Sequence, residues 1–175
     1  KLNILEIGTY DGKFSNYLSK LFPSSEITTI DLKENDIIFN QSIGIHNKEK
    51  VERFINKRNI NIDRPNINFL KINSFFLRQY FPNNFFDLVW VDGDHVNPQV
   101  TIDIFNSLDL VKKNGYICVD DILKDEKYNT KLASVESYKT ITKIEKLNLI
   151  DAYYIYKRVK EKKGTKFVSI IKVKK

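Results

Sequence analysis

The sequence has 175 residues and is poor in sulfur: it contains no methionine and one cysteine. Cys118 cannot form a disulfide within the chain, which favours a reducing compartment such as the cytoplasm. Its position inside the apolar run 116–119 predicts a buried packing residue rather than a reactive thiol. No apolar run approaches the roughly 20 residues that a membrane-spanning helix needs, and the first residues show no signal-peptide pattern. We therefore expect a cytoplasmic protein without a membrane partner.

The missing methionine means that the initiator residue is absent, and the chain opens almost directly on an apolar run. We expect either a minimal core or a trimmed version of a longer chain. The length suits one domain spanning residues 1–175.

Acidic residues are the minority among the charges: 22 Asp and Glu stand against 29 Lys and Arg, which gives a net charge of +7. A basic balance is typical of proteins that meet nucleic acid or phosphates. Much of the charge lies between residues 157 and 175, where a solvated hairpin and tail explain it more simply. Nucleic acid is therefore the less favoured partner, and a small molecule the favoured one.

Hydrophobic periodicity predicts alternating strands and helices. The expected strands are 2–7, 26–32, 67–72, 86–91, 116–120, 152–159 and 166–173, and the expected helices are 13–21, 49–58, 98–111 and 132–147. Residues 112–115 are expected to form a turn, and 33–45 give no clear signal. The last two strands flank a short polar loop with Gly164, which indicates an antiparallel hairpin.

The most informative segment is 5–12, in which Glu6, Gly8 and Gly12 follow an apolar run. A strand, a glycine turn and a helix N-terminus let the backbone approach a nucleotide-like ligand. A second carboxylate, Asp31, ends the next strand at the distance expected for a ribose ligand, about 20 residues further on. Tyr10 stands where a dinucleotide site needs its second glycine, so a cofactor with a single adenosine end is favoured.

This E-x-G-x-x-x-G pattern resembles the first motif of class I S-adenosylmethionine-dependent methyltransferases, particularly metal-dependent O-methyltransferases of the catechol and sugar type. The resemblance implies an α/β, Rossmann-like fold: a mostly parallel seven-stranded sheet with a C-terminal antiparallel hairpin and helices on both faces. It also implies S-adenosyl-L-methionine as cofactor. The residues that would bind it are Glu6, Gly8, Thr9, Tyr10, Gly12, Asp31, Leu32, Asn73 and Asp92.

Further acids follow two later strands, as Asp92-Gly93-Asp94-His95 and as Asp120-Asp121. Carboxylates crowded at neighbouring strand ends repel one another unless cations bridge them, and oxygen-rich sites suit Mg²⁺ or another divalent cation. Both segments resemble metal-site motifs of the same O-methyltransferases. The resemblance implies Asp92, Asp120 and Asp121 as metal ligands and Asp94 as general base. His95 is a second candidate base, because the ordinary pKa of an imidazole, about 6.5, suits proton uptake.

Simpler interpretations remain open for these residues. Asp92 can instead contact only the ammonium group of the cofactor, and Asp120 can cap the turn that follows it. His95 can orient Asp94 without acting on the substrate. After His95 the sequence departs from the family pattern with Val-Asn-Pro at 96–98, which leaves the acceptor unidentified.

The function predicted from these motifs is divalent-metal-dependent O-methylation of a small hydroxylated molecule. One alternative is an RNA or DNA methyltransferase that uses the basic surface. Another is a hydroxylase or a non-methylating cofactor-binding relative on the same scaffold. Assembly into a homodimer is a further possibility, because a second copy can supply a missing wall of the site.

Overall fold

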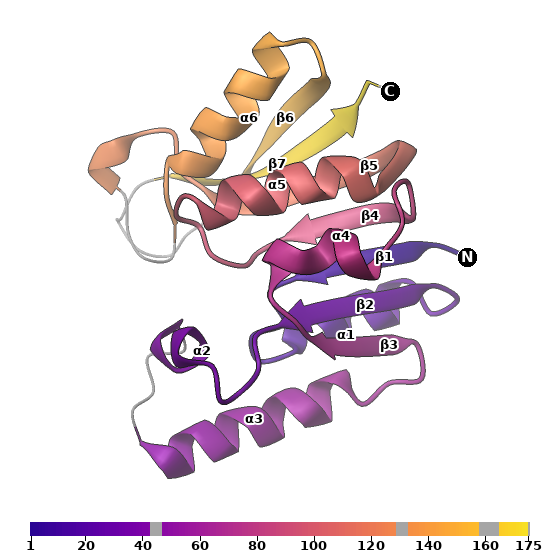
Figure 1. Cartoon of the computed structure of the whole chain (residues 1–175), viewed down its shortest axis with the longest axis vertical. Coiled ribbons are helices and arrows are strands. Elements are labelled where there is room, and N and C mark those ends of the chain that lie inside the picture. Colours follow the sequence, from indigo (N-terminus) through magenta and orange to yellow (C-terminus); the bar gives the residue numbers. More distant parts are fainter. Residues whose placement is uncertain (43–46, 129–132, 158–164, 175) are drawn as a thin grey trace.

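The computed structural model describes residues 1–42, 47–128, 133–157 and 165–174. They form a seven-stranded sheet in the order β3-β2-β1-β4-β5-β7-β6 (Figure 1). The strands are β1 (Asn3–Ile7), β2 (Glu26–Asp31), β3 (Ile67–Lys71), β4 (Phe86–Val91), β5 (Val111–Ile122), β6 (Ile150–Lys157) and β7 (Lys166–Val173). Strands β1 to β5 are parallel, and β7 is antiparallel to both β5 and β6. The predicted fold class is confirmed, including the C-terminal hairpin.

Helices cover both faces of the sheet (Figure 1). The helices are α1 (Lys13–Leu21), α2 (Ile37–Ser42), α3 (Lys48–Ile62), α4 (Leu77–Tyr80), α5 (Gln99–Leu110) and α6 (Glu136–Lys146). Helix α1 lies behind the sheet, whereas α4, α5 and α6 lie in front of it in this view. Among the described residues, none of these helices combines the length and the apolar character needed to cross a membrane.

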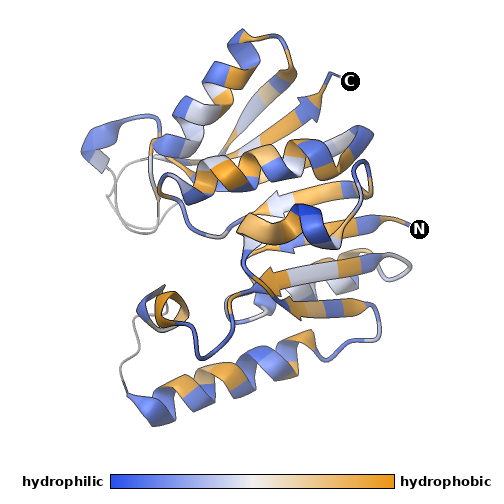
Figure 2. Ribbon diagram, in the orientation of Figure 1, coloured by the Kyte–Doolittle hydropathy of each residue, from blue (hydrophilic) through white to orange (hydrophobic). Residues whose placement is uncertain are grey.

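The main core lies between the sheet and the helices in front of it. Apolar and hydrophilic residues alternate along helix α5 (Figure 2). Its Ile104 belongs to the same buried cluster as Val89 of β4 and Ile117 of β5. A smaller cluster on the opposite face joins Leu18 of α1 to Ile4 of β1. Burial on both faces explains the nearly continuous apolar runs of the central parallel strands.

Several predicted boundaries are wrong. Residues 112–115 belong to β5 rather than to a separate turn, and Asn114 accommodates the local bend with a φ of 66°. Helix α3 runs on to Ile62, because the apolar stripe alone underestimates its length. The predicted helix 132–147 begins too early: residues 133–135 are not helical, Ser134 forms a bridge with Ile122, and α6 begins at Glu136. Residue 132 and the loop with Gly164 lie outside the described residues.

Candidate active site

The carboxyl ends of four neighbouring strands lie side by side. In the sheet register Ile7 pairs with both Ile30 and Val91, and Val91 pairs with Val119. Each of these paired residues is directly followed by a residue of the predicted site: Gly8, Asp31, Asp92 and Asp120. The amide of Asp92 donates to the carbonyl oxygen of Ile7 at 2.9 Å, which continues the pairing past the strand ends. The acids predicted from sequence are therefore gathered at one edge of the sheet, where open α/β sheets bind ligands.

Gly8 has a φ of 100°, and a Cβ atom placed there would lie 2.3 Å from the carbonyl oxygen of Asp92. Only glycine permits this approach between the first loop and the end of β4. Gly12 has a different task. A Cβ at Gly12 would lie 2.7 Å from Cγ2 of Ile62, so this glycine lets α1 pack against α3. That contact explains Gly12 without any cofactor.

Glu6 of β1 is buried against Ser15 of α1 and Thr29 of β2. It is 1% exposed, and its carboxyl group accepts hydrogen bonds from the hydroxyls of Ser15 and Thr29. The Thr9 hydroxyl lies 2.7 Å from that of Thr29 and extends the same network. Burial raises the pKa of Glu6 to about 7, although the two hydroxyl hydrogen bonds oppose the shift. The structure thus gives Glu6 and Thr9 a clear role in fixing the glycine turn.

Asp31 holds the loop from its other side. Its Oδ2 accepts a hydrogen bond from the amide of Tyr10, and its Oδ1 accepts one from the amide of Leu32, both at 2.8 Å. Burial raises the pKa of Asp31, against the effect of these two hydrogen bonds and of Arg58. Each carboxylate oxygen has a further lone pair, which suits Asp31 to accept from the vicinal hydroxyls of a ribose.

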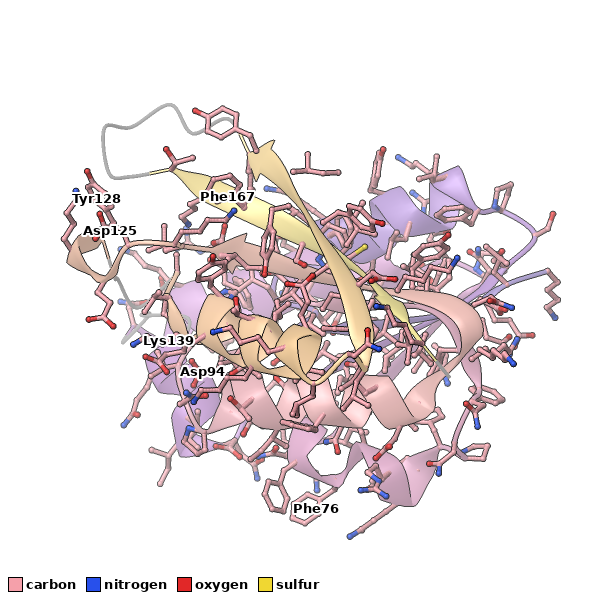
Figure 3. The ribbon with its side chains drawn as sticks, turned by 90° about the horizontal axis from the view of Figure 1, so that it is seen from above. Phe76, Asp94, Asp125, Tyr128, Lys139 and Phe167 are labelled. Atoms are coloured by element: carbon pink, nitrogen blue, oxygen red, sulfur yellow. The ribbon has the colours of Figure 1, made fainter. Side chains whose placement is uncertain are left out.

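The end of β3 supplies a polar turn with aromatic residues beside it. Oδ1 of Asn73 accepts a hydrogen bond from the amide of Phe75 at 2.9 Å and caps the short helix Ser74–Phe76. Phe75 and Phe76 are exposed, and Figure 3 shows Phe76 pointing away from the sheet. The predicted contact of Asn73 and Leu32 with an adenine ring remains a prediction.

A buried polar network behind this turn was missed from the sequence. Nε2 of Gln99 donates to Oγ of Ser74 and to Oδ1 of Asp103, both at 2.8 Å. Burial raises the pKa of Asp103 to about 6. The network ties α5 to the turn after β3. The sequence gives no signal for this network, because it depends on contacts between α5 and the distant turn after β3.

Asp92 and His95 form a pair at the end of β4. Nε2 of His95 lies 3.6 Å from Oδ1 of Asp92. Burial, reinforced by Asp120 and Asp121, raises the pKa of Asp92 to about 8. Burial lowers the pKa of His95, so its imidazole is neutral at physiological pH. Ser134, which the sequence did not single out, donates to the carbonyl oxygen of His95 and holds this segment in place.

Asp94 takes a different position from its neighbours. It is exposed, and its Oδ1 accepts a hydrogen bond from the amide of Val96 at 3.0 Å. Of the two predicted catalytic residues, His95 is therefore the one that the structure sets against Asp92, while Asp94 caps the following turn.

Asp120 and Asp121 both face the C-terminal hairpin. The register between β5 and β7 shifts after Val119, and Asp121 has a φ of 51°, so the strand bulges at this point. Nζ of Lys157 lies 2.7 Å from Oδ2 of Asp120, and Nζ of Lys166 lies 2.8 Å from Oδ2 of Asp121. Burial would raise the pKa of Asp121, but hydrogen bonds from Lys166 and Lys157 bring it below its ordinary value.

These contacts decide how well the predicted metal ligands fit a divalent cation. The carboxylates of Asp120 and Asp121 already accept from lysine ammonium groups, which lie where a cation would have to bind. Within the part of the chain that the structure describes, no group of three or more His, Cys, Asp or Glu residues is arranged to hold a metal ion. The arrangement of Asp92, Asp120 and Asp121 therefore does not fit the predicted Mg²⁺ site.

The sequence model of a methyltransferase domain family matches residues 5–122, which include every strand end described above except the hairpin. The chain belongs to this methyltransferase domain family. Together with the fold, this membership identifies it as a class I S-adenosylmethionine-dependent methyltransferase. A search of curated proteins found no match.

Solved methyltransferase structures share the fold at low sequence identity. The N-methyltransferase NodS from Bradyrhizobium japonicum WM9, in complex with S-adenosyl-L-homocysteine, is 16% identical with a TM-score of 0.66, covering 99% of this chain and 79% of its own. An O-methyltransferase from Bacillus cereus is 20% identical with a TM-score of 0.59, covering 98% and 74%. The O-methyltransferase TomG from Streptomyces achromogenes is 17% identical with a TM-score of 0.62, covering 99% and 73%.

Proposed function

We propose that this methyltransferase transfers a methyl group from S-adenosylmethionine to a hydroxyl oxygen of a small molecule. The observation that carries the proposal is the Asp92–His95 pair at a strand edge that also holds Asp31 and the Gly8 loop. A neutral imidazole beside the predicted cofactor position supports the proposal. The Bacillus cereus and Streptomyces achromogenes structures, which are O-methyltransferases, support the choice of oxygen.

We infer the cofactor position from the charged groups at the carboxyl ends of the parallel strands. Asp31 is placed to accept from the ribose hydroxyls, and the backbone at Gly8 lies close enough to Asp92 to line the methionine portion. S-adenosylmethionine carries a sulfonium and an ammonium group. Burial, with repulsion from Asp120 and Asp121, raises the pKa of the Asp92 carboxyl group, and a cation beside this group opposes that shift. Binding would therefore ionise Asp92, which then holds the ammonium group.

The acceptor chemistry needs a base, since a hydroxyl is a weak nucleophile until its proton is removed. His95 is neutral and 8% exposed, so it can take up that proton inside a site with little water. Asp92 lies at 3.6 Å and would stabilise the imidazolium that forms. When bound, the cofactor supplies the electrophilic methyl group. No step of the proposed reaction passes through a metal, because the predicted ligands do not fit one.

Methyl transfer from isotopically labelled S-adenosylmethionine to panels of phenols, sugars, amines and RNA tests this proposal. We expect labelling of hydroxylated molecules and a loss of turnover, at unchanged cofactor affinity, in His95→Gln. Asp125→Asn changes an exposed acid in the segment after β5 and serves as the control. Labelling confined to amines would make the chain an N-methyltransferase, as NodS is. Labelling confined to RNA would indicate that RNA, bound at the basic surface, is the acceptor. Either result would refute the proposal.

A further inference from the structure

Two lysines face each other across the C-terminal hairpin. Lys157 is the last residue of β6 and pairs directly with Lys166, the first residue of β7. Like charges directly opposite on antiparallel strands destabilise the pairing. Something must therefore compensate this pair, and the compensating groups are the two acids that end β5.

The contacts between these four side chains leave no carboxylate oxygen of the two acids unpaired. Nζ of Lys157 lies 2.9 and 2.7 Å from the two oxygens of Asp120, and 3.0 Å from Oδ1 of Asp121. Nζ of Lys166 lies 2.8 Å from the remaining oxygen, Oδ2 of Asp121. The carboxylate side chains are 10% and 16% exposed, and the side chains of Lys157 and Lys166 are 41% and 20% exposed, so the contacts are partly shielded from water. Charge-assisted hydrogen bonds of this kind are stronger than those between neutral groups.

The backbone is shaped to make this arrangement. The bulge between Val119 and Ile122 places consecutive residues, Asp120 and Asp121, where the hairpin can reach both. The amide of Asp121 donates to Oδ1 of Asp120 at 2.7 Å, which fixes the first carboxylate against the bulge. Two negative charges then face two positive charges within one cluster.

We propose that Lys157 and Lys166 take the place of a divalent cation at the end of β5, so that this methyltransferase works without a metal and its hairpin is fastened to the active-site edge. A divalent ion would have to displace two ammonium groups and leave them facing each other across the hairpin. The inference rests on the proposed function only in placing this cluster beside the cofactor.

The test compares Mn²⁺ binding to the wild-type protein and to the double variant Lys157→Gln/Lys166→Gln, measured by calorimetry and by the electron paramagnetic resonance of free Mn²⁺. We expect no saturable binding to the wild type, and a thermal midpoint that neither EDTA nor Mg²⁺ changes. The double variant should lose thermal stability, gain one Mn²⁺ site at least about 10-fold tighter than any wild-type binding, and recover stability with Mg²⁺.

Lys112→Gln is the matched control. Lys112 forms an ion pair with Asp87 at 2.9 Å, away from the cluster, and its loss should create no metal site. If the double variant does not fold, Lys157→Gln alone carries the test, because it leaves Asp120 without its ammonium partner. Saturable Mn²⁺ binding to the wild type that disappears in Asp120→Asn would overturn the proposal. So would a folded lysine variant that gains no metal affinity.

Titration of S-adenosylmethionine separates this inference from the proposed function. Absence of cofactor binding, together with the expected Mn²⁺ results, would refute the proposed function but support the inference about Lys157 and Lys166. Methyl transfer that stops with EDTA and resumes with Mg²⁺ would refute the lysine inference while supporting the transferase.

Discussion

Nζ of Lys157 lies 2.7 Å from Oδ2 of Asp120 and joins the last residue of β6 to the acid-lined end of β5. The pairing gives the C-terminal hairpin a direct part in the site, because Asp120 also acts electrostatically on Asp92. The hairpin is therefore more than a cover for the sheet edge: it sets the charge that a cofactor meets at the end of β4.

Gly8→Ala should unfold or severely destabilise the protein. The added Cβ would lie 2.3 Å from the carbonyl oxygen of Asp92, on backbone with a φ of 100°. We expect a loss of at least about 3 kcal/mol in urea denaturation, since both strain and overlap oppose folding. Gly93→Ala is the control, because its Cβ would meet its nearest neighbour, Oδ2 of Asp103, at 3.3 Å. Equal losses for the two variants would contradict this account of the loop.

Asp31→Asn should weaken S-adenosylmethionine binding more than it weakens the fold. A hydrogen bond to a charged group contributes about 1.5–3 kcal/mol, so calorimetry should show a loss of roughly 10- to 100-fold in affinity. Glu49→Gln removes an exposed acid that forms an ion pair within α3 and should leave the affinity unchanged. Full affinity in a folded Asp31→Asn protein would show that this carboxylate does not bind the cofactor.

Glu6→Gln should change how stability depends on pH. The pKa of Glu6 is raised from 4.5 to about 7 in the folded state, so between these values the unfolded chain binds fewer protons than the native one. Stability from this group is complete below pH 4.5 and falls as pH rises through 7. The ionised carboxyl costs up to about 3 kcal/mol above that range. Denaturation at pH 5 and pH 8 should show Glu6→Gln gaining on the wild type at the higher pH; a constant difference would contradict the shift.

Cys118 should react slowly with alkylating reagents. The side chain is only half-buried on β5, less than its sequence context predicts, but burial and Asp120 raise the pKa of its thiol to about 11. The thiolate is the reactive form, so iodoacetamide labelling at pH 8 should be much slower in the folded protein than in urea. Equal rates in the two conditions would show that Cys118 is an ordinary accessible thiol.

The fold is well predicted from the sequence, because strands and helices are recognised from patterns of neighbouring residues. Apolar runs ending in Gly8 or Asp31 mark strand ends, and parallel strands bring their carboxyl ends to one edge of the sheet. The same reasoning brings Asp92 beside Gly8, as the structure confirms. It fails for the extent of β5, where an internal Asn114 at positive φ resembles a turn.

The partners of these acids could not be predicted in the same way. Lys157 lies 37 residues beyond Asp120, and nothing in a lysine-rich segment distinguishes an ammonium group that pairs with a carboxylate from a solvated one. Strand alternation can pair Lys157 with Lys166, but it does not show that a bulge turns two acids toward them. The hydrogen bonds of Glu6 could not be predicted for a similar reason, because the hydroxyls of Ser15 and Thr29 that donate to it lie on other elements.

The most direct test of the account is calorimetric titration of S-adenosylmethionine into protein stripped of metal with EDTA, then repeated with Mg²⁺. We expect one cofactor bound per chain, the same affinity in both titrations, and a clear loss of affinity in Asp31→Asn. Absence of binding in both titrations would contradict the assignment of the strand edge as a cofactor site. Binding that appears only with Mg²⁺ would contradict the role given to Lys157 and Lys166.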